Sequence, residues 1–331
     1  MSKFEQVFGV QCRSPKAPMK PLRIGFFGLP LAALLLQRDG CELGWAVLSP
    51  VPAPGRRRLN ALLPRDSVID LLVDDSGFER RVDSLFDASA IDLVVSWFYT
   101  RRIAEPWLQR ALLGGIGVHP SLLPRHRGAD PFYWAIDSDD AETGVTVHRL
   151  EADYDTGAIL AQRRLPIGEL NAWQLARALD RPSLAALREV VRTYAAGRFC
   201  AATTQEEAGV TLAPEPSGHW LQVDWCWPTE RVLRRIRALA PVPGLALEVN
   251  GLEFFVQKAC VAPTFPQALL PGEAFIGSRL LLRTGDGAIA IERAQLAEQN
   301  PGLLEEGVDQ PPAEPIAGEL LAQLLGKLAR N

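Results

Sequence analysis

The chain has 331 residues, of which 47% are hydrophobic and 22% charged, and its formal net charge is −4. At about 150 residues per domain, this length predicts two domains with sizeable cores. No segment reaches the roughly 18 uninterrupted apolar residues of a helical membrane span, so we expect no membrane as a partner.

The first twenty residues carry four cations but lack the apolar block and cleavage site of a secretory signal. We interpret residues 1–20 as an N-terminal extension of a cytoplasmic protein. The five cysteines have no CxxC spacing, and their odd number argues against a disulfide framework. The four histidines, at positions 119, 126, 148 and 219, form no ligand cluster in the sequence, so we expect no metal.

The first half of the chain alternates short apolar runs with amphipathic segments. This pattern predicts an α/β domain with a Rossmann-like parallel sheet that is covered on both faces. Ligands of such sheets bind beyond the carboxyl ends of the strands, where His119 and the loop after Tyr99 fall. The single glycine turn at Gly28 is no GxGxxG fingerprint, which argues against a nicotinamide cofactor. The expected strands are 22–29, 41–49, 68–75 and 91–99, and the expected helices are 29–40 and 77–89.

Two strings carry the chemistry of this sequence. The first is GIGVHPSLLPRHRGADPFYWAI, residues 115–136, and the second is EADYDTGAIL, residues 151–160. A neutral imidazole such as that of His119 can take a proton from an amine or polarise a carbonyl, and the Asp155 carboxylate can orient it. A lone histidine more often caps a strand end, but the two strings together favour an acid/base pair.

Together these strings resemble those of the folate-dependent formyltransferases, in which an Asn-x-His-Pro-Ser-Leu-Leu-Pro segment and a later Asp-x-Gly segment surround the formyl group of 10-formyltetrahydrofolate. The resemblance implies that this folate is the co-substrate, that His119 acts on the formyl group and that Asp155 assists it. It also implies a pterin pocket between the loops 97–102 and 150–157. The implied folate contacts are Ser121, Leu122, Leu123, Pro124, Trp97, Phe98 and Tyr99, and for the three aromatic residues simple core packing is an equal alternative.

Gly117 stands where the family has its asparagine, which donates to the oxyanion of the tetrahedral intermediate. Loss of one such donor typically costs about 10² to 10³ in rate. A water, another residue or the substrate can replace the donor, or the pocket is enlarged for a bulkier or differently charged acceptor. Alternatively, the site binds folate without transfer. We favour retained chemistry because His119, Asp155 and the loop glycines remain together.

The second half predicts a different architecture. Residues 171–197 predict a helix, broken at Pro182, that closes a catalytic domain of residues 21–200, and residues 201–220 predict a linker. Residues 221–244 indicate a strand and a short helix, and two hairpins follow, with turns at Asn250 and around GDG, residues 285–287. This order resembles the C-terminal OB-like β-barrel domain of methionyl-tRNA formyltransferases, here residues 221–331.

The acceptor of the formyl group is the least determined element. Arg56, Arg57 and Arg58 lie where methionyl-tRNA formyltransferases have a basic loop that enters the acceptor stem, but a solvated loop is an equal interpretation. The altered site fits a small-molecule amine of a specialised biosynthetic pathway better, such as an amino sugar, a hydroxylated ornithine or an amino-acid-derived metabolite. We therefore expect an N-formyltransferase of a small metabolite, with initiator tRNA as the second choice and a non-catalytic folate-binding protein as the third.

Overall fold

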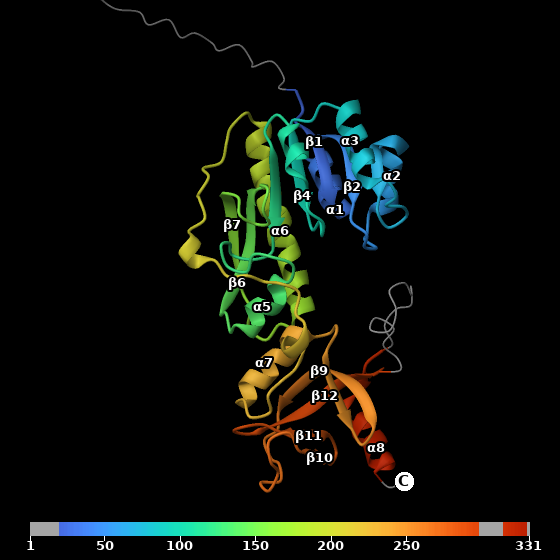
Figure 1. The fold of residues 1–331 in the computed structure, drawn as a ribbon, viewed down its shortest axis with the longest axis vertical. Helices are drawn as coiled ribbons and strands as arrows, with labels where there is room; N and C mark the ends of the chain where they lie inside the picture. The colour runs from blue at the N-terminus through green and yellow to red at the C-terminus, as the bar shows by residue number, and fades with distance from the viewer. Residues whose placement is uncertain (1–19, 298–313, 330–331) are drawn as a thin grey trace, which may run out of the picture.

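The structure is a computed structural model that describes residues 20–297 and 314–329. The predicted extension, residues 1–20, lies outside these ranges except for its last residue. Figure 1 shows an elongated molecule with an α/β domain at one end and a small β domain at the other. The prediction of these two architectures in this order is confirmed, and the exact domain boundaries stay a prediction.

A seven-stranded sheet forms the first domain, in the order β3-β2-β1-β4-β5-β6-β7. The first five strands along the chain pair in parallel, and the last two pair antiparallel to their neighbours. The sequence patterns did not predict this final hairpin, which carries the second of the two strings in its loop. The strands are β1 (Arg23–Gly28), β2 (Glu42–Leu48), β3 (Val68–Asp70), β4 (Leu93–Trp97), β5 (Gly115–His119), β6 (Glu142–Arg149) and β7 (Ile159–Pro166).

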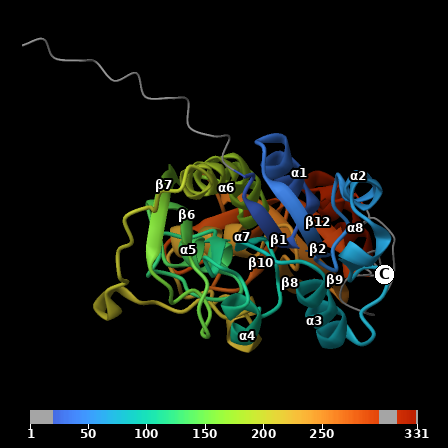
Figure 2. The same cartoon turned by 90° about the horizontal axis from the view of Figure 1, so that it is seen from above.

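Helices cover both faces of this sheet, as its continuous apolar strands predict. Successive residues of β1 point to opposite faces, so Phe26 packs in one core cluster and Phe27 in the other. Figure 2 shows α1 and α6 on one side of the sheet and α3 and α4 on the other. The helices are α1 (Pro30–Arg38), α2 (Arg56–Leu62), α3 (Phe78–Ala88), α4 (Glu105–Gln109), α5 (Pro131–Asp137) and α6 (Ala172–Ala195).

The predicted break at Pro182 is wrong, because α6 runs through this residue without interruption. An internal proline costs roughly 3 kcal/mol through its missing N–H and its ring. Here Ser183 follows it, and this buried hydroxyl donates to the carbonyl of Asp180 and accepts from the indole of Trp97. The buried stripe around the proline, which includes Leu179 and Leu187, packs on the sheet and outweighs the lost hydrogen bond.

A curled antiparallel sheet forms the second domain, in the order β10-β11-β12-β9-β8 with β13 beside β12. Both predicted hairpins are present, and the turn at Asn250 and Gly251 has the two positive φ angles that a tight hairpin requires. In the described pairings β8 and β10 are the edges of the sheet. Its elements are α7 (Thr229–Leu239), β8 (Leu245–Val249), β9 (Leu252–Val261), β10 (Ala274–Ile276), β11 (Leu280–Arg283), β12 (Ala288–Leu296), β13 (Ile316–Ala317) and α8 (Gly318–Leu328).

The strand expected at the start of residues 221–244 is absent. A short 3-10 helix, η3 (Gly218–Leu221), and a turn occupy this region. The turn forms because the Asp224 side chain accepts the N–H of Cys226 and its carbonyl accepts that of Trp227. Such local bonds compete with strand pairing.

Candidate active site

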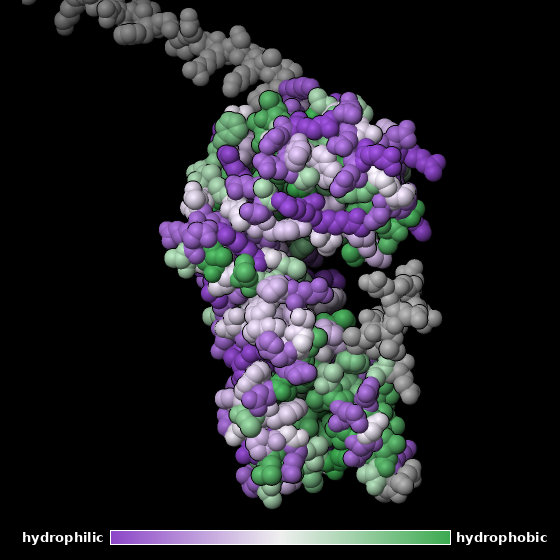
Figure 3. All heavy atoms as spheres, in the orientation of Figure 1, coloured by the Kyte–Doolittle hydropathy of each residue, from purple (hydrophilic) through white to green (hydrophobic). Residues whose placement is uncertain are grey.

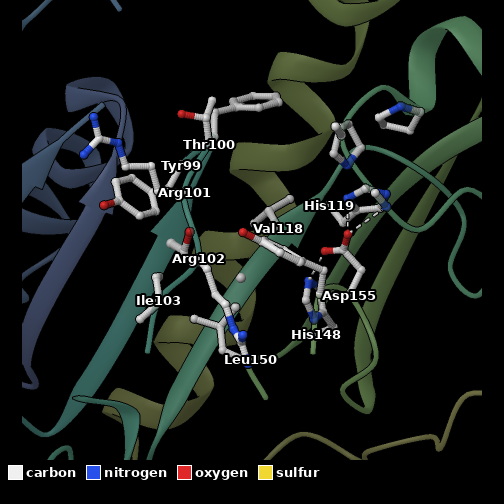
Figure 4. A pocket seen from close by; sticks show the side chains of 18 of the residues that line it. Tyr99, Thr100, Arg101, Arg102, Ile103, Val118, His119, His148, Leu150 and Asp155 are labelled. Atoms are coloured by element: carbon white, nitrogen blue, oxygen red, sulfur yellow. Dashed lines mark hydrogen bonds and ion pairs between the residues drawn. The ribbon is translucent and has the colours of Figure 1, made fainter. Parts of the chain in front are cut away.

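A cavity of about 710 Å³ opens beyond the carboxyl ends of β4 and β5. Most of its lining residues come from four segments that are far apart in the chain, and Ser96 and Glu215 complete the lining. The four segments are residues 98–103, 117–120, 128–132 and 148–155. The volume is in the range of small-molecule sites. Figure 4 shows the loop residues after β4 on one side and three ionisable side chains, from β5, β6 and the loop after β6, on the other.

His119 is buried at the end of β5. Its Nε2 atom lies 2.7 Å from the carbonyl oxygen of His126, and its Nδ1 atom lies 3.4 Å from Oδ2 of Asp155. A carbonyl oxygen only accepts hydrogen bonds, so Nε2 carries a hydrogen. In the neutral ring the free lone pair is therefore on Nδ1, which faces Asp155.

Asp155 has a φ of +58°, a conformation that costs energy in a residue other than glycine. Its Oδ2 atom accepts the N–H of Gly128 at 3.1 Å. The buried side chain of Gln205 holds the backbone of this loop, because its Nε2 atom donates to the carbonyls of Asp155 at 2.7 Å and Gly157 at 2.8 Å. The Gln205 carbonyl in turn accepts from Arg127 at 3.0 Å.

Gln205 lies in the segment that the sequence analysis interpreted as a linker. The segment does connect the two domains, but it also packs along the active-site loops. Residues 203 and 212 bridge to β7 and to the loop after β5, and Thr211 accepts the N–H of His126 at 2.8 Å. No sequence pattern marked this role, because the contacts join residues that are 44 to 85 positions apart, from the bridge of Ile159 with Thr203 to the bond of His126 with Thr211.

His148 is a third ionisable group at the site, and the sequence analysis missed it. Its Nε2 atom lies 3.5 Å from Oδ1 of Asp155, and its Nδ1 atom lies 2.8 Å from the carbonyl oxygen of Arg149. Burial lowers the pKa of His148, although the neighbouring Asp155 carboxylate acts in the opposite direction. His148 of β6 is the strand partner of Gly117 in β5. This register depends on the β6–β7 hairpin, which the sequence patterns did not predict.

Gly117 leaves little free space beside it. A Cβ atom at this position would lie 2.7 Å from Cδ2 of Leu150 and 3.5 Å from Nε2 of His148. At the position of the family's asparagine, Leu150 therefore occupies part of the space that a side chain would need, and His148 adjoins it.

Two of the three predicted aromatic contacts line the cavity, namely Phe98 and Tyr99. The Tyr99 ring packs against Phe27 with centroids 5.1 Å apart. The third, Trp97, does not line the cavity. Its side chain points into the core, is 3% exposed and donates a hydrogen bond to Ser183 at 3.0 Å. Trp97 is the last residue of β4, whereas Phe98 follows the strand with a φ of +50°, so the backbone turns between the two residues.

The four predicted contacts Ser121, Leu122, Leu123 and Pro124 also lie outside the cavity lining. Ser121 donates to the carbonyl of Arg125 at 2.6 Å, and the N–H of Leu123 donates to Thr146 at 3.1 Å. Gln162 donates to the Leu123 carbonyl at 2.8 Å. These bonds hold the turn against β6 and β7, so the segment supports His119 from behind.

Comparison with known proteins agrees with this geometry. A family profile described as formyl transferase matches residues 61–190, and one described as formyl transferase, C-terminal domain, matches residues 220–306. A methionyl-tRNA formyltransferase of Phenylobacterium zucineum is 32% identical over 295 residues, with 85% of this chain and 94% of the relative covered. One of Burkholderia pseudomallei is 32% identical over 314 residues, with 93% and 88% covered. The chain belongs to the formyltransferase family.

Solved structures share the fold of this formyltransferase at low identity. HypX from Aquifex aeolicus, in complex with tetrahydrofolic acid, has a TM-score of 0.64 at 19% identity, with 94% of this chain and 48% of HypX covered. WlaRD, a sugar 3N-formyl transferase, has a TM-score of 0.62 at 14% identity, with 85% and 99% covered. The prediction that the protein is a formyl-transferring enzyme is confirmed.

The charges around the cavity of this formyltransferase are mostly negative. Its lining includes four carboxylates, from Glu151, Asp153, Asp155 and Glu215, and two guanidinium groups. Of these cations, Arg101 pairs with Asp75 at 2.7 Å and Arg102 donates to the carbonyl of Ala152. In the described ranges, no group of three or more His, Cys, Asp and Glu residues could hold a metal ion, and no helix is long and apolar enough to cross a membrane.

The three arginines expected in a basic loop belong to a helix instead. Arg56 is the first residue of α2, and its guanidinium binds Asp70 and the carbonyls of Ser49 and Val51. Arg57 and Arg58 are exposed. Only two of the three cations are therefore available to a partner.

Proposed function

We propose that this formyltransferase moves the formyl group of 10-formyltetrahydrofolate to the amine of a small metabolite in a specialised biosynthetic pathway. The observation that carries the reaction is the pair of His119 Nδ1 and Asp155 Oδ2, 3.4 Å apart at the cavity wall. Structures with the same fold support the co-substrate, because HypX binds tetrahydrofolic acid and WlaRD was crystallised with 5-N-formyl-tetrahydrofolate.

The reaction requires one proton to leave and one to arrive. As the amine nitrogen attacks, a C–N bond forms and the carbonyl electron pair moves to oxygen. The amine loses a proton, which Nδ1 of His119 is free to take, and the Asp155 carboxylate stabilises the resulting imidazolium. When the oxyanion collapses, the bond to the folate nitrogen breaks, and this nitrogen takes the proton.

The lining of the cavity suits the binding of a flat heterocycle such as a pterin. Tyr99 and Ile103 lie across the cavity from His119 (Figure 4), and Phe98 and Leu150 add further apolar side chains to its lining. Residues 98–103 and 150–153 also line the cavity, and their backbone groups can hydrogen-bond a pterin edge. We propose these two loops as the folate site.

The distribution of cations supports a small acceptor over a nucleic acid. Residues 221–331 contain ten Lys and Arg and thirteen Asp and Glu. In the described part of this domain, all cations except Arg293 and Lys327 have a carboxylate or carbonyl partner. The paired cations are Arg231, Arg234, Arg235, Arg237, Lys258, Arg279 and Arg283.

Binding of a phosphate backbone depends on cations that are free to release its counterions. Figure 3 shows hydrophobic side chains gathered over the C-terminal domain instead. Its exposed apolar residues include Val261, Leu270, Phe275, Leu320 and Leu328.

Methionyl-tRNA formylation is the second candidate. It is favoured by the named relatives, which match nearly the whole chain, and by the exposed Arg57 and Arg58. The experiment that separates the candidates incubates the protein with 10-formyltetrahydrofolate and, in separate arms, a panel of amines and charged initiator tRNA. Release of tetrahydrofolate is followed by absorbance and product by mass. The proposal expects turnover with an amine. Turnover with tRNA alone would identify initiator tRNA as the acceptor in place of a small amine. No turnover in any arm would overturn the proposed function.

A further inference from the structure

His148 has the geometry of a group that takes part in the reaction. Its ring lines the cavity, is buried, and approaches the same carboxylate as His119 from the other side. We propose that His148 is a catalytic residue of this formyltransferase, whose Nε2 atom donates a hydrogen bond to the formyl oxygen as negative charge develops there. This inference rests on the proposed transfer from 10-formyltetrahydrofolate.

The hydrogen bonds around the two rings fix where their protons lie. Nε2 of His119 donates to the carbonyl of His126, and Nδ1 of His148 donates to the carbonyl of Arg149. The atoms that remain, His119 Nδ1 and His148 Nε2, both face Asp155, which brings two further acceptors. Figure 4 shows Asp155 between the two rings. Acceptors that face one another in this way hold a shared proton well.

The reaction supplies that proton. The attacking amine releases one proton to the cluster of His119, Asp155 and His148, and the negative charge forming on the formyl oxygen favours its position on Nε2 of His148. The protonated ring then donates to the oxyanion. On collapse the electron pair returns to carbon, the bond to the folate nitrogen breaks, and the cluster gives its proton to that nitrogen. The cluster therefore ends in the state in which it began.

Packing alone does not account for a histidine at this position. Its ring lines the cavity, and the Nε2 atom lies 3.5 Å from Oδ1 of Asp155, a distance that leaves it able to turn its hydrogen-bonding capacity toward a bound molecule. An apolar residue at this place would offer a bound molecule no such group. The ring also adjoins Gly117, the position where the resemblance expects an oxyanion donor, at 3.5 Å from where a Cβ atom would lie.

The test compares His148→Leu with His148→Gln. The acceptor is the amine that the panel identifies, and the panel includes hydroxylamine as a small surrogate amine. Leucine keeps the volume but cannot donate, whereas glutamine keeps a donor. A catalytic role predicts that the leucine variant loses about 10² to 10³ in kcat and that the glutamine variant retains clearly more. His219→Gln, the same change at a histidine of η3 outside the cavity, serves as the control and should keep its rate.

Two further readouts separate catalysis from folding. Binding of tetrahydrofolate should change less than threefold, and the thermal midpoint by only a few degrees, in both His148 variants. The inference is overturned if the leucine variant keeps its kcat, or if leucine equals or exceeds glutamine. A parallel loss of folate binding and thermal stability assigns a structural role and also overturns it.

A second cycle tests the relation to Gly117. In the natural background, Gly117→Asn should lower kcat, because its Cβ atom would lie 2.7 Å from Cδ2 of Leu150 and its amide would compete with the adjoining His148 ring for the same space. In the His148→Ala background, the same substitution should raise kcat at least tenfold, because an amide donor then occupies the vacated space. An equal loss in both backgrounds overturns the role as oxyanion donor. No turnover by the unaltered protein overturns the proposed function itself, so the two failures are distinguishable.

Discussion

Two aspartates of the first domain are both shielded from water but have opposite surroundings. The side chain of Asp137, at the end of α5, is 4% exposed and receives four hydrogen bonds of 2.6 to 3.1 Å from Arg231 and Arg235 of α7. The side chain of Asp155 is 15% exposed, receives one hydrogen bond from Gly128 and faces two imidazole rings at 3.4 and 3.5 Å.

The difference shows how a fold assigns a buried carboxylate to stability or to chemistry. Asp137 is fully paired, and its partner Arg235 also donates to the carbonyls of Trp220 and Gln222, which joins the two domains. Asp155 keeps an incomplete set of partners on a loop with positive φ, which leaves its protonation open to change during a reaction.

The sharpest test of this comparison is Asp155→Asn. We expect kcat for formyl transfer to fall about 10³-fold, roughly 4 kcal/mol of transition-state stabilisation, because the amide cannot stabilise an imidazolium. Urea denaturation should give an unchanged free energy of unfolding within about 1 kcal/mol. A destabilised protein with normal kcat would reverse the roles of the two aspartates.

The reciprocal change is Asp137→Asn. Breaking a buried ion pair from one side typically costs about 3 to 5 kcal/mol, because Arg235 is left buried beside a neutral group. The free energy of unfolding measured in urea should fall by this amount, while kcat per folded molecule stays within about twofold. If the urea midpoint does not move, the contact between the two domains is not stabilised by the ion pairs of Asp137 with Arg231 and Arg235.

Gln205→Ala should have a smaller effect on rate. It removes two hydrogen bonds that hold the backbone of the Asp155 loop, so the carboxylate should be misplaced in part of the molecules. We expect kcat to fall about 10-fold to 100-fold with little change in the KM for the folate. Gln257→Ala, in the second domain, is the matched control. A rise in KM with normal kcat would assign Gln205 to ligand binding instead.

Acid should gradually weaken the contact between the two domains that Asp137 forms with Arg231 and Arg235. Burial by itself raises the pKa of Asp137, but the hydrogen bonds from Arg231 and Arg235 outweigh it and place the pKa below its ordinary value. The stability that this carboxylate contributes is therefore complete above about pH 4 and is lost as pH falls through the lowered pKa. Thermal midpoints measured between pH 6 and pH 2.5 should fall less steeply in Asp137→Asn than in the unaltered protein.

The smallest expected effect is that of replacing Arg57 and Arg58 by alanine. Arg56 is left in place because it binds Asp70 within the fold. With a small amine as acceptor, kcat/KM should stay within about twofold and keep its salt dependence. A large loss that grows at low salt would show phosphate contacts and promote tRNA to first choice.

Sequence patterns predicted the parts of this molecule that depend on local order. The period of the apolar runs indicated the sheet and its helices, and the HPSLLP and DTG strings indicated His119 and Asp155, which the structure brings together. The contributions of His148 and Gln205 depend on strand register and on a returning segment, neither of which leaves a local pattern. The predicted folate contacts Ser121–Pro124 and Trp97 lie outside the cavity lining, because tertiary contacts set the direction of their side chains.

The path of residues 201–217 limits how this protein can be divided. A chain cut after residue 200 would keep His119, Asp155 and the whole seven-stranded sheet, but it would lose the amide that holds the Asp155 backbone and the Thr211 hydroxyl that binds His126. The catalytic domain thus depends on residues of the connecting segment for the geometry of its active site. Any shuffling of the catalytic half onto another protein must carry the connecting segment with it, up to at least Ala213, whose backbone exchanges hydrogen bonds with Arg127 and Asp130.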